Sequence, residues 1–310
     1  MTLSAKSPPE ARQPPPLRGQ PLDSAQRGEG PFVWRFRLYH RWTHAAVVVS
    51  FFTLVLTGLP LRYSGAFWAQ PLIGLFGGVA SAGVIHRIAA LMTFGYFGAH
   101  VAYLVNLFIR TPPRDRVKLL WGPDSMMPQP RDVVDVLDQI RWFLGRGPRP
   151  RFGRFSYMEK FDYFAVFWGV AIIGGSGLLL WFPEFFGRFL PGWIFNVATV
   201  VHADEALLAS GFIFTIHFFN VHLRPEKFPL DAVMFTGRAT VSYMEEEHPL
   251  TVERHIRGRL DEPVSERAIP DAPAPPPSRA ATLVAAALGF LAVAVGFMCV
   301  GLILWALAFS

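Results

Sequence analysis

The sequence predicts an all-α membrane protein, with a four-helix transmembrane bundle followed by a fifth, C-terminal transmembrane helix. Three observations lead to this fold class. The 310 residues are 52% hydrophobic and have a mean hydropathy of +0.31, which is high for a soluble domain. Five stretches lack charge over roughly the 20 residues that a bilayer-crossing helix needs. Two histidine pairs at almost the same spacing also lie in or beside two of these stretches.

Each predicted span contains an uncharged run of 18 or more residues, which is uncommon in soluble helices. The spans cover residues 43–63, 84–108, 162–182, 199–222 and 281–309. Between the second and third spans, Asp132–Leu144 alternates apolar and charged residues, which favours a short amphipathic helix at the membrane surface. The run from Glu159 to Tyr163 begins the third span, and we interpret it as a charged collar at the interface.

The chain divides into four parts by composition. Residues 1–35 are rich in Pro, Arg and Gln without an apolar core, so we expect a disordered tail and no cleavable signal peptide. Residues 36–230 form the four-helix domain, and 231–279 form a surface segment that ends in a proline-rich, extended linker. Residues 280–310 carry no histidine and no charge, so we expect a plain membrane anchor.

Basic residues alternate between the two sides of the predicted membrane. The tail up to Arg41 holds seven Lys and Arg, segment 109–161 holds eleven, and segment 223–279 holds eight. The two intervening segments, 62–85 and 183–198, hold one each. The positive-inside rule therefore predicts a cytoplasmic N-terminus and an external C-terminus. The net charge of +6 follows this pattern and does not indicate a nucleic-acid partner.

The histidine pairs predict a metal-binding interior. His86 and His100 are 14 residues apart in the second span, and His202 and His217 are 15 apart in the fourth. On an α-helix each pair is separated by about 21–23 Å and points broadly one way. Both spans run in the same direction, so His86 matches His202 in depth, and His100 matches His217. Imidazole is a common axial ligand of haem iron, and we predict an outer and an inner haem.

The single cysteine, Cys299, lies in the fifth span. It excludes a disulfide framework, a Cys-rich iron–sulfur site and covalent haem attachment through C-x-x-C-H. The two predicted haems are therefore non-covalent, b-type groups.

This arrangement resembles the cytochrome b family of quinol-oxidising complexes, in which the second and fourth helices each carry two ligands at this long spacing. The resemblance covers mainly residues 84–222. It implies electron transfer, quinone as a substrate, and the bacterial cytoplasmic membrane. The run from Phe218 to Pro229 also resembles the end of the fourth span in bacterial di-haem cytochromes b that accompany multihaem c-type cytochromes.

The chain is similar as well to the cytochrome b subunits of formate dehydrogenases and nickel–iron hydrogenases. The motifs are His40-Arg41-Trp42-Thr43-His44, Leu56-Thr57-Gly58 and the paired histidines of the fourth span. In that family the inner haem takes one ligand from the start of the first span, which corresponds to His44. The two resemblances disagree about the ligands of the inner haem. We predict that His100 and His217 hold it, and we keep His44 as the alternative to His100. A third haem between His44 and His222 is a further alternative.

Several other polar residues lie where a haem or a quinone needs partners. Arg62 and Arg87 are at the outer face, and a guanidinium suits a haem propionate. Asp204 and Glu205 follow His202, and ionisable groups within a span are usually functional. With His222 and His44, they are the candidates for quinone and proton chemistry.

The sequence therefore predicts transmembrane electron transfer between the quinone pool and a partner redox protein. A partner is implied because the chain has no dinucleotide fingerprint and no soluble redox domain. The candidates for it are a c-type cytochrome, an iron–sulfur protein and a molybdenum or nickel enzyme. Membrane lipid surrounds the chain. Two alternatives stay open: a haem-free, proton-coupled transporter that uses the same histidines and acids, and a passive anchor for a redox complex.

Overall fold

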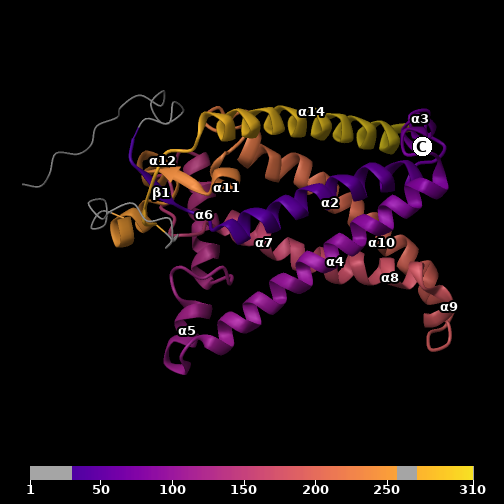
Figure 1. Ribbon diagram of the computed structural model, residues 1–310, viewed down its shortest axis with the longest axis horizontal. Coiled ribbons are helices and arrows are strands. Elements are labelled where there is room, and N and C mark those ends of the chain that lie inside the picture. The colour runs from indigo at the N-terminus through magenta and orange to yellow at the C-terminus, as the bar shows by residue number, and fades with distance from the viewer. Residues whose placement is uncertain (1–29, 257–270, 310) are drawn as a thin grey trace, which may run out of the picture.

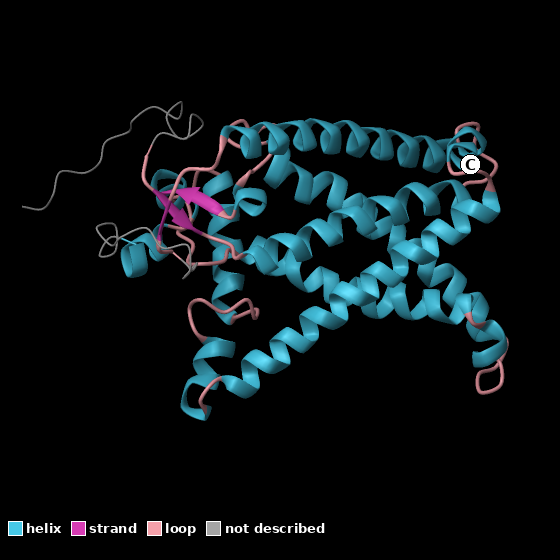
Figure 2. Ribbon diagram, viewed as in Figure 1, coloured by secondary structure: helices cyan, strands magenta, loops and turns pink. Residues whose placement is uncertain are grey.

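Five long helices dominate the computed structural model, which describes residues 30–256 and 271–309 (Figures 1 and 2). The third and fourth of them each contain π-helical turns, labelled η. The five are α2 (Leu38–Arg62), α4 (Val79–Arg110), α7–η1–α8 (Tyr157–Trp181), α10–η2–η3 (Trp193–Leu223) and α14 (Arg279–Phe309). Each is long and apolar enough to cross a membrane. The prediction of a largely α-helical, multi-pass membrane protein is confirmed, with helices that begin two to six residues earlier than expected and end within two residues of the expected positions.

Short elements gather at the two ends of the long helices. One end carries only α3 (Ala69–Leu75) and α9 (Pro183–Phe186), while the opposite end carries a larger assembly (Figure 1). We call this assembly the cap; it comprises residues 30–37, 111–156, 224–256 and 271–278. Its helical elements are α5 (Pro113–Trp121), α6 (Pro130–Phe143), α11 (Val233–Thr236), α12 (Val241–Glu247), α13 (Pro249–Thr251) and η4 (Val252–Ile256). Helix α6 is the amphipathic helix predicted at Asp132–Leu144.

A three-stranded antiparallel sheet lies within the cap, in the order β2–β1–β3. The strands are β1 (Phe32–Trp34), β2 (Arg238–Thr240) and β3 (Pro273–Ala274). Two expectations need correction here, since residues 30–35 do not belong to a disordered tail and Pro273–Ala274 is not free linker. The physical reason is burial, because Val33 is fully buried against residues of β2, α12 and η4. The rest of the predicted tail, 1–29, and segment 257–270 lie outside the described residues.

Three of the π-helical segments lie in the third and fourth spans, whereas η4 lies in the cap. Segment η1 (Val170–Gly174) interrupts the third span, while η2 (Ile213–His217) and η3 (Phe219–Leu223) end the fourth. A π turn holds one more residue than an α turn, and such turns are frequent at functional sites. The 15-residue interval from His202 to His217 ends in η2, so it spans about the same number of turns as the 14-residue interval in α4.

Helix α14 packs tightly on the other helices instead of standing apart as a plain anchor. A single stripe of its small residues is buried, and it comprises Ala285, Gly289, Gly296, Cys299 and Ala306. A Cβ at Gly296 would lie 2.4 Å from Cε2 of Phe218, and one at Gly289 would lie 2.8 Å from the carbonyl oxygen of Pro229. Small residues permit this close approach of helices in lipid. The proline-rich connection therefore leads back onto the bundle.

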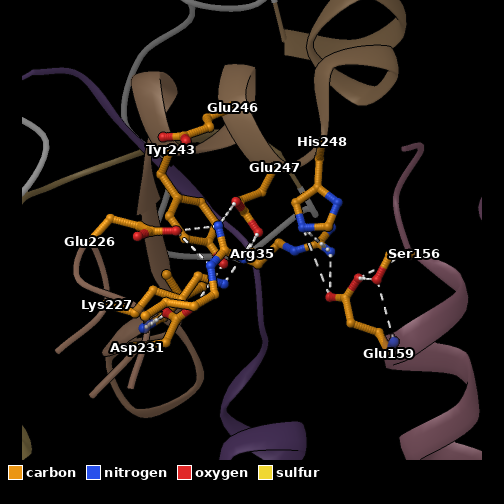
Figure 3. Close-up of polar contacts among 12 residues, drawn as sticks. Arg35, Ser156, Glu159, Glu226, Lys227, Asp231, Tyr243, Glu246, Glu247 and His248 are labelled. Atoms are coloured by element: carbon orange, nitrogen blue, oxygen red, sulfur yellow. Dashed lines mark hydrogen bonds and ion pairs between the residues drawn. The ribbon is translucent and has the colours of Figure 1, made fainter. Parts of the chain in front are cut away.

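Ion pairs hold the cap together where the fourth span ends (Figure 3). Arg224 and Lys227 both bond the carboxylate of Glu247, at 2.8 and 3.2 Å, and Lys227 also pairs with Asp231 at 3.1 Å. The hydroxyl of Tyr243 donates to Asp231 at 2.8 Å. Burial alone would raise the pKa of Glu247, but hydrogen bonds from Arg224 and the nearby cationic charges lower it to about 2.

A second polar cluster ties the sheet to the start of the third span. The side chain of Arg35 is only 1% exposed and contacts Glu159 at 3.4 Å and Nε2 of His248 at 3.3 Å (Figure 3). Glu159 also completes a capping box with Ser156 at the first turn of α7. Arg154 extends the cluster by pairing with Asp271 beside β3 at 2.7 Å. The cap is thereby fixed to the membrane-spanning helices.

Replacing Gly296 with Val should destabilise the protein, because the added side chain would overlap Phe218. Overpacking of this kind costs about 1–3 kcal/mol. The matched control is Gly301→Val on the same helix, where a Cβ meets nothing within 4 Å. Thermal unfolding in detergent, followed by circular dichroism, measures both. Equal midpoints for the two variants would contradict the packing of α14 on the fourth span.

The cap should loosen in acid, because the pKa of Glu247 is about 2 when folded, below its ordinary 4.5. For a carboxylate with a lowered pKa, the stabilisation is complete above the ordinary value and is lost as the pH falls towards the folded value. The protection of α12 amides from hydrogen exchange, measured relative to the intrinsic exchange rate at each pH, should therefore fall between about pH 5 and 2, and Glu247→Gln should flatten this dependence. Glu245→Gln removes the same charge from a residue without an ion pair among the described residues, and should leave the profile unchanged.

Candidate functional site

Two of the predicted ligands, from the second and fourth spans, come together in the structure. His86 on α4 and His202 on α10 have ring centroids 6.3 Å apart, with planes inclined by 69°. Nδ1 of His86 lies 2.9 Å from Oγ1 of Thr57 on α2, and Nδ1 of His202 lies 2.9 Å from the carbonyl oxygen of Ile173 in η1. Each ring is therefore oriented by a helix other than its own.

These hydrogen bonds define which ring nitrogen carries the proton. The carbonyl oxygen of Ile173 can only accept, so Nδ1 of His202 must donate. The hydroxyl of Thr57 already donates to the carbonyl oxygen of Thr53 at 2.6 Å, so it accepts from Nδ1 of His86. Nε2 of both rings is then unprotonated. An Nδ1–H held by a partner, with Nε2 free to bind, is the usual state of a metal-ligating histidine.

A glycine lies against each of the two rings. A Cβ at Gly58 would lie 3.4 Å from Cε1 of His86, and a Cβ at Gly177 would lie 3.0 Å from Cε1 of His202. Each glycine follows a hydroxyl residue, Thr57 or Ser176, and Oγ of Ser176 lies 3.4 Å from Nδ1 of His202. The first and third spans thus supply matching hydroxyl–glycine pairs, which orient the rings and let them pack close to the helix backbone.

The spacing of His86 and His202 fits a six-coordinate iron between them. A metal lies about 2 Å from a ligating imidazole nitrogen, so two rings on opposite sides of one ion have centroids roughly 6 Å apart. The observed separation is 6.3 Å. The separation, the fixed tautomers and the glycine cradle are all compatible with a haem held by these residues.

The other end of the fourth span carries His217, which is oriented by an acid. Nδ1 of His217 donates to Oδ2 of Asp162 at 2.8 Å, and both side chains are about one-fifth exposed. A carboxylate in this position fixes the orientation and the tautomer of the ring. Oδ1 of the same carboxylate is buried and has no hydrogen bond within residues 30–256 and 271–309.

His44 and His222 lie near His217. His44 on α2 is close enough to interact electrostatically with both, and its ring packs edge-on against Phe235 at 5.9 Å. His222 is buried, and its Nδ1 donates to the carbonyl oxygen of Pro229 at 2.8 Å. His222 therefore also has an unprotonated Nε2. Three histidines from the first and fourth spans thus gather near the cap.

His100 lies in a different environment. Its Nδ1 is 3.2 Å from the hydroxyl of Tyr39, and its Nε2 is 2.9 Å from the hydroxyl of Tyr163. Tyr39 and Tyr103 also stack on the ring, each at 6.2 Å. Within the described part of the chain no ring contact joins His100 to His217. The structure thus brings His86 to His202 as expected, but surrounds His100 with tyrosines.

The charged residues predicted to serve a haem or a quinone contact other side chains of the protein. Arg62 bonds Asp204 at 2.8 Å, and both side chains are about half exposed. The guanidinium of Arg87 lies over the ring of Trp181 at 5.8 Å. Glu205 accepts a hydrogen bond from the indole of Trp168 at 3.3 Å. All of these residues are near the outer pair of histidines in sequence or in space, and Arg62 and Asp204 act as one ion pair.

Sequence reasoning missed the residues that orient the histidines. Asp162 and Tyr163 belong to the run that we interpreted as an interfacial collar, whereas both contact histidines of other helices. A helical wheel of the third span offers one signal, since Asp162, Val166, Gly169 and Ile173 recur at helical spacing on one side. Tyr39 gives no sequence signal, because its role depends on how α2 crosses α4.

Comparisons with known proteins do not identify the chain. Neither the search of protein-family models nor that of curated proteins finds a match.

Proposed function

We propose that this chain is a di-haem b-type cytochrome that transfers electrons across a membrane between the quinone pool and a partner redox protein. The observation that carries the proposal is the His86–His202 pair, with facing rings, Nδ1–H held on both sides and Nε2 unprotonated. A bound haem would supply a one-electron carrier. His86 and His202 would hold it through Nε2, with their tautomers fixed by Thr57 and Ile173, and the surrounding apolar helices would exclude water.

For the inner haem we favour His44 and His217 over the predicted pair of His100 and His217. His217 is oriented by Asp162, and His44 on the first span is close enough to interact with it electrostatically. Both nitrogens of His100 are hydrogen-bonded to tyrosines, so ligation by His100 would require breaking one of these bonds. His222 has a suitable tautomer and lies in the same group, and it is the alternative partner for His44.

We assign quinone chemistry to the Tyr39–His100–Tyr163 chain. A neutral imidazole donates one hydrogen bond and accepts another. The tyrosine whose oxygen accepts the imidazole N–H therefore keeps its own O–H free for another acceptor, such as a quinone oxygen. Nδ1 of the neighbouring His40 is buried without a partner among the described residues. A quinol that passes two electrons to the haems also loses two hydroxyl protons, and a tyrosine–imidazole chain can accept and relay them.

The charge of the cap supports an orientation in the membrane. The described parts of the basic segments 109–161 and 223–279 lie largely in the cap, so we place the cap on the cytoplasmic side of a bacterial inner membrane by the positive-inside rule. The chain then has its N-terminus in the cytoplasm and its C-terminus outside. We propose that a second redox subunit delivers or removes the electrons.

A haem-free proton carrier is the second candidate function. The hydrogen-bonded groups Asp162–His217 and Tyr39–His100–Tyr163 favour it, because such groups can relay protons within a membrane. The visible absorption spectrum of the purified protein separates the two functions. Haem absorption bands support the cytochrome, and their absence from a folded, haem-supplemented preparation rejects it.

We predict two haems per chain, and loss of one of them in His86→Ala or His202→Ala. Each substitution removes one axial nitrogen of the outer site and leaves the inner site intact. Haem extracted from purified protein should fall from two equivalents to one. His255→Ala is the control, since His255 is an exposed cap residue bonded to Asp124. Full haem content in either ligand variant would contradict the outer assignment.

His44→Ala and His100→Gln should separate ligation from quinone chemistry. His44→Ala should lose the inner haem, with a matching loss of absorbance. His100→Gln should retain both haems, yet slow their reduction by added quinol roughly tenfold or more, because proton transfer loses its acceptor. Haem loss in His100→Gln with full content in His44→Ala would restore the His100–His217 pair. Unchanged quinol kinetics in His100→Gln would reject its assigned role.

A further inference from the structure

A polar cavity lies where the cap meets the starts of α2 and α14. It has a volume of about 380 Å³. Its lining includes Arg41, Thr236, Arg238 and the Pro276–Ser278 turn. Helices α2 and α14 begin at Leu38 and Arg279, so the cavity is level with the cap-side ends of two membrane-spanning helices (Figure 1). This is the depth at which lipid headgroups lie.

Two guanidinium groups converge on this cavity. Nε of Arg41 donates to the carbonyl oxygen of Phe235 at 2.7 Å, while Nη1 of Arg238 donates to that of Pro276 at 3.0 Å. The guanidinium of Arg238 also lies 4.7 Å from the ring centre of Trp34, and its Nε is buried without a partner among the described residues. The two arginines are close enough to repel each other.

No carboxylate within residues 30–256 and 271–309 forms an ion pair with Arg41 or Arg238. Two neighbouring cations, of which one has an unpaired buried N–H, favour an anion between them. The first turn of the 31-residue helix α14 adds to this preference, because its backbone N–H groups lack intrahelical acceptors and carry partial positive charge. Of these, the N–H of Ala281 bonds Oγ of Ser278 at 3.2 Å.

An apolar groove continues from the polar cavity along α14. A second cavity of about 210 Å³ shares Arg41, Thr236 and Ala281 with the first. Beyond these residues it is lined by Phe235, Val284, Ala285 and Leu288. The side chains of Val284 and Leu288 are 58% and 45% exposed. The site therefore changes from cationic to apolar along the direction in which α14 enters the membrane.

We propose that this site binds one phospholipid with an anionic headgroup. The phosphate lies between Arg41, Arg238 and the first turn of α14, and one acyl chain follows Val284 and Leu288. Basic pockets at the ends of transmembrane helices suit anionic lipids. A choline headgroup would place a cation beside two arginines. A free phosphate would leave the groove unused, so the two-part shape favours a lipid.

The test uses the full chain in mild detergent and native mass spectrometry with added lipid. Phosphatidylglycerol should be retained roughly tenfold or more over phosphatidylcholine with the same acyl chains. The double variant Arg41→Gln/Arg238→Gln should lose this preference. The control double variant Arg114→Gln/Arg146→Gln removes the same charge from exposed cap residues and should keep it. Equal binding of the two lipids, or an unchanged preference in the first double variant, would overturn the site.

A second variant tests the groove with both arginines in place. Leu288→Trp should fill the apolar groove, weakening phosphatidylglycerol with long acyl chains but not its dihexanoyl form. Thermal midpoints of all variants report folding, and this variant keeps the test open if the arginine variant unfolds. Inorganic phosphate that displaces long-chain phosphatidylglycerol at equal concentration, or unchanged long-chain binding in Leu288→Trp, would show a simple anion site and reject the lipid assignment.

Discussion

A histidine inside a membrane must satisfy its ring N–H within the protein, because lipid offers no acceptor. In this chain the acceptors come from neighbouring helices: a hydroxyl for His86, a backbone carbonyl for His202 and a carboxylate for His217. Each bond crosses between spans, so it fixes the relative rotation of two helices as well as the tautomer of one ring. The positions of the spans and the chemistry of the site thus depend on the same set of bonds.

The hydroxyl–glycine pairs show how close packing and ligation are combined. The two pairs, Thr57-Gly58 and Ser176-Gly177, lie on different spans but have the same arrangement. In each, the hydroxyl lies near Nδ1 of a histidine, and the glycine lacks the Cβ that would touch the histidine ring. The π turns of the third and fourth spans contribute further. Segment η1 contains Ile173, which accepts the bond from His202, and η2 ends at His217. Irregular helix geometry therefore occurs where side chains need adjustment.

The cap and α14 support the histidine-bearing helices by packing around them. Arg35 joins strand β1 to the first turn of the third span, and the Arg224–Glu247 pair holds the chain where the fourth span ends. Helix α14 covers Phe214 and Phe218, which neighbour His217 in the fourth span. A lipid between α14 and the cap would complete this support at the membrane surface. Since His217 lies among these contacts, the inner histidines depend on the cap more than the outer pair does.

The sequence alone determined the five long helices, the amphipathic helix and the meeting of His86 with His202. These follow from hydropathy, helical period and equal depth in spans that run the same way, all of which are local or one-dimensional quantities. Only the tertiary structure decided the neighbours of His100, the pairing of Arg62 with Asp204, the place of Val33 in a sheet and the packing of α14. Each of these depends on the rotation and crossing of helices, which are set by side-chain contacts between segments far apart in the chain. Spacing places His100 at the depth of His217, but the rotation of α4 against α2 and α7 turns its ring towards Tyr39 and Tyr163.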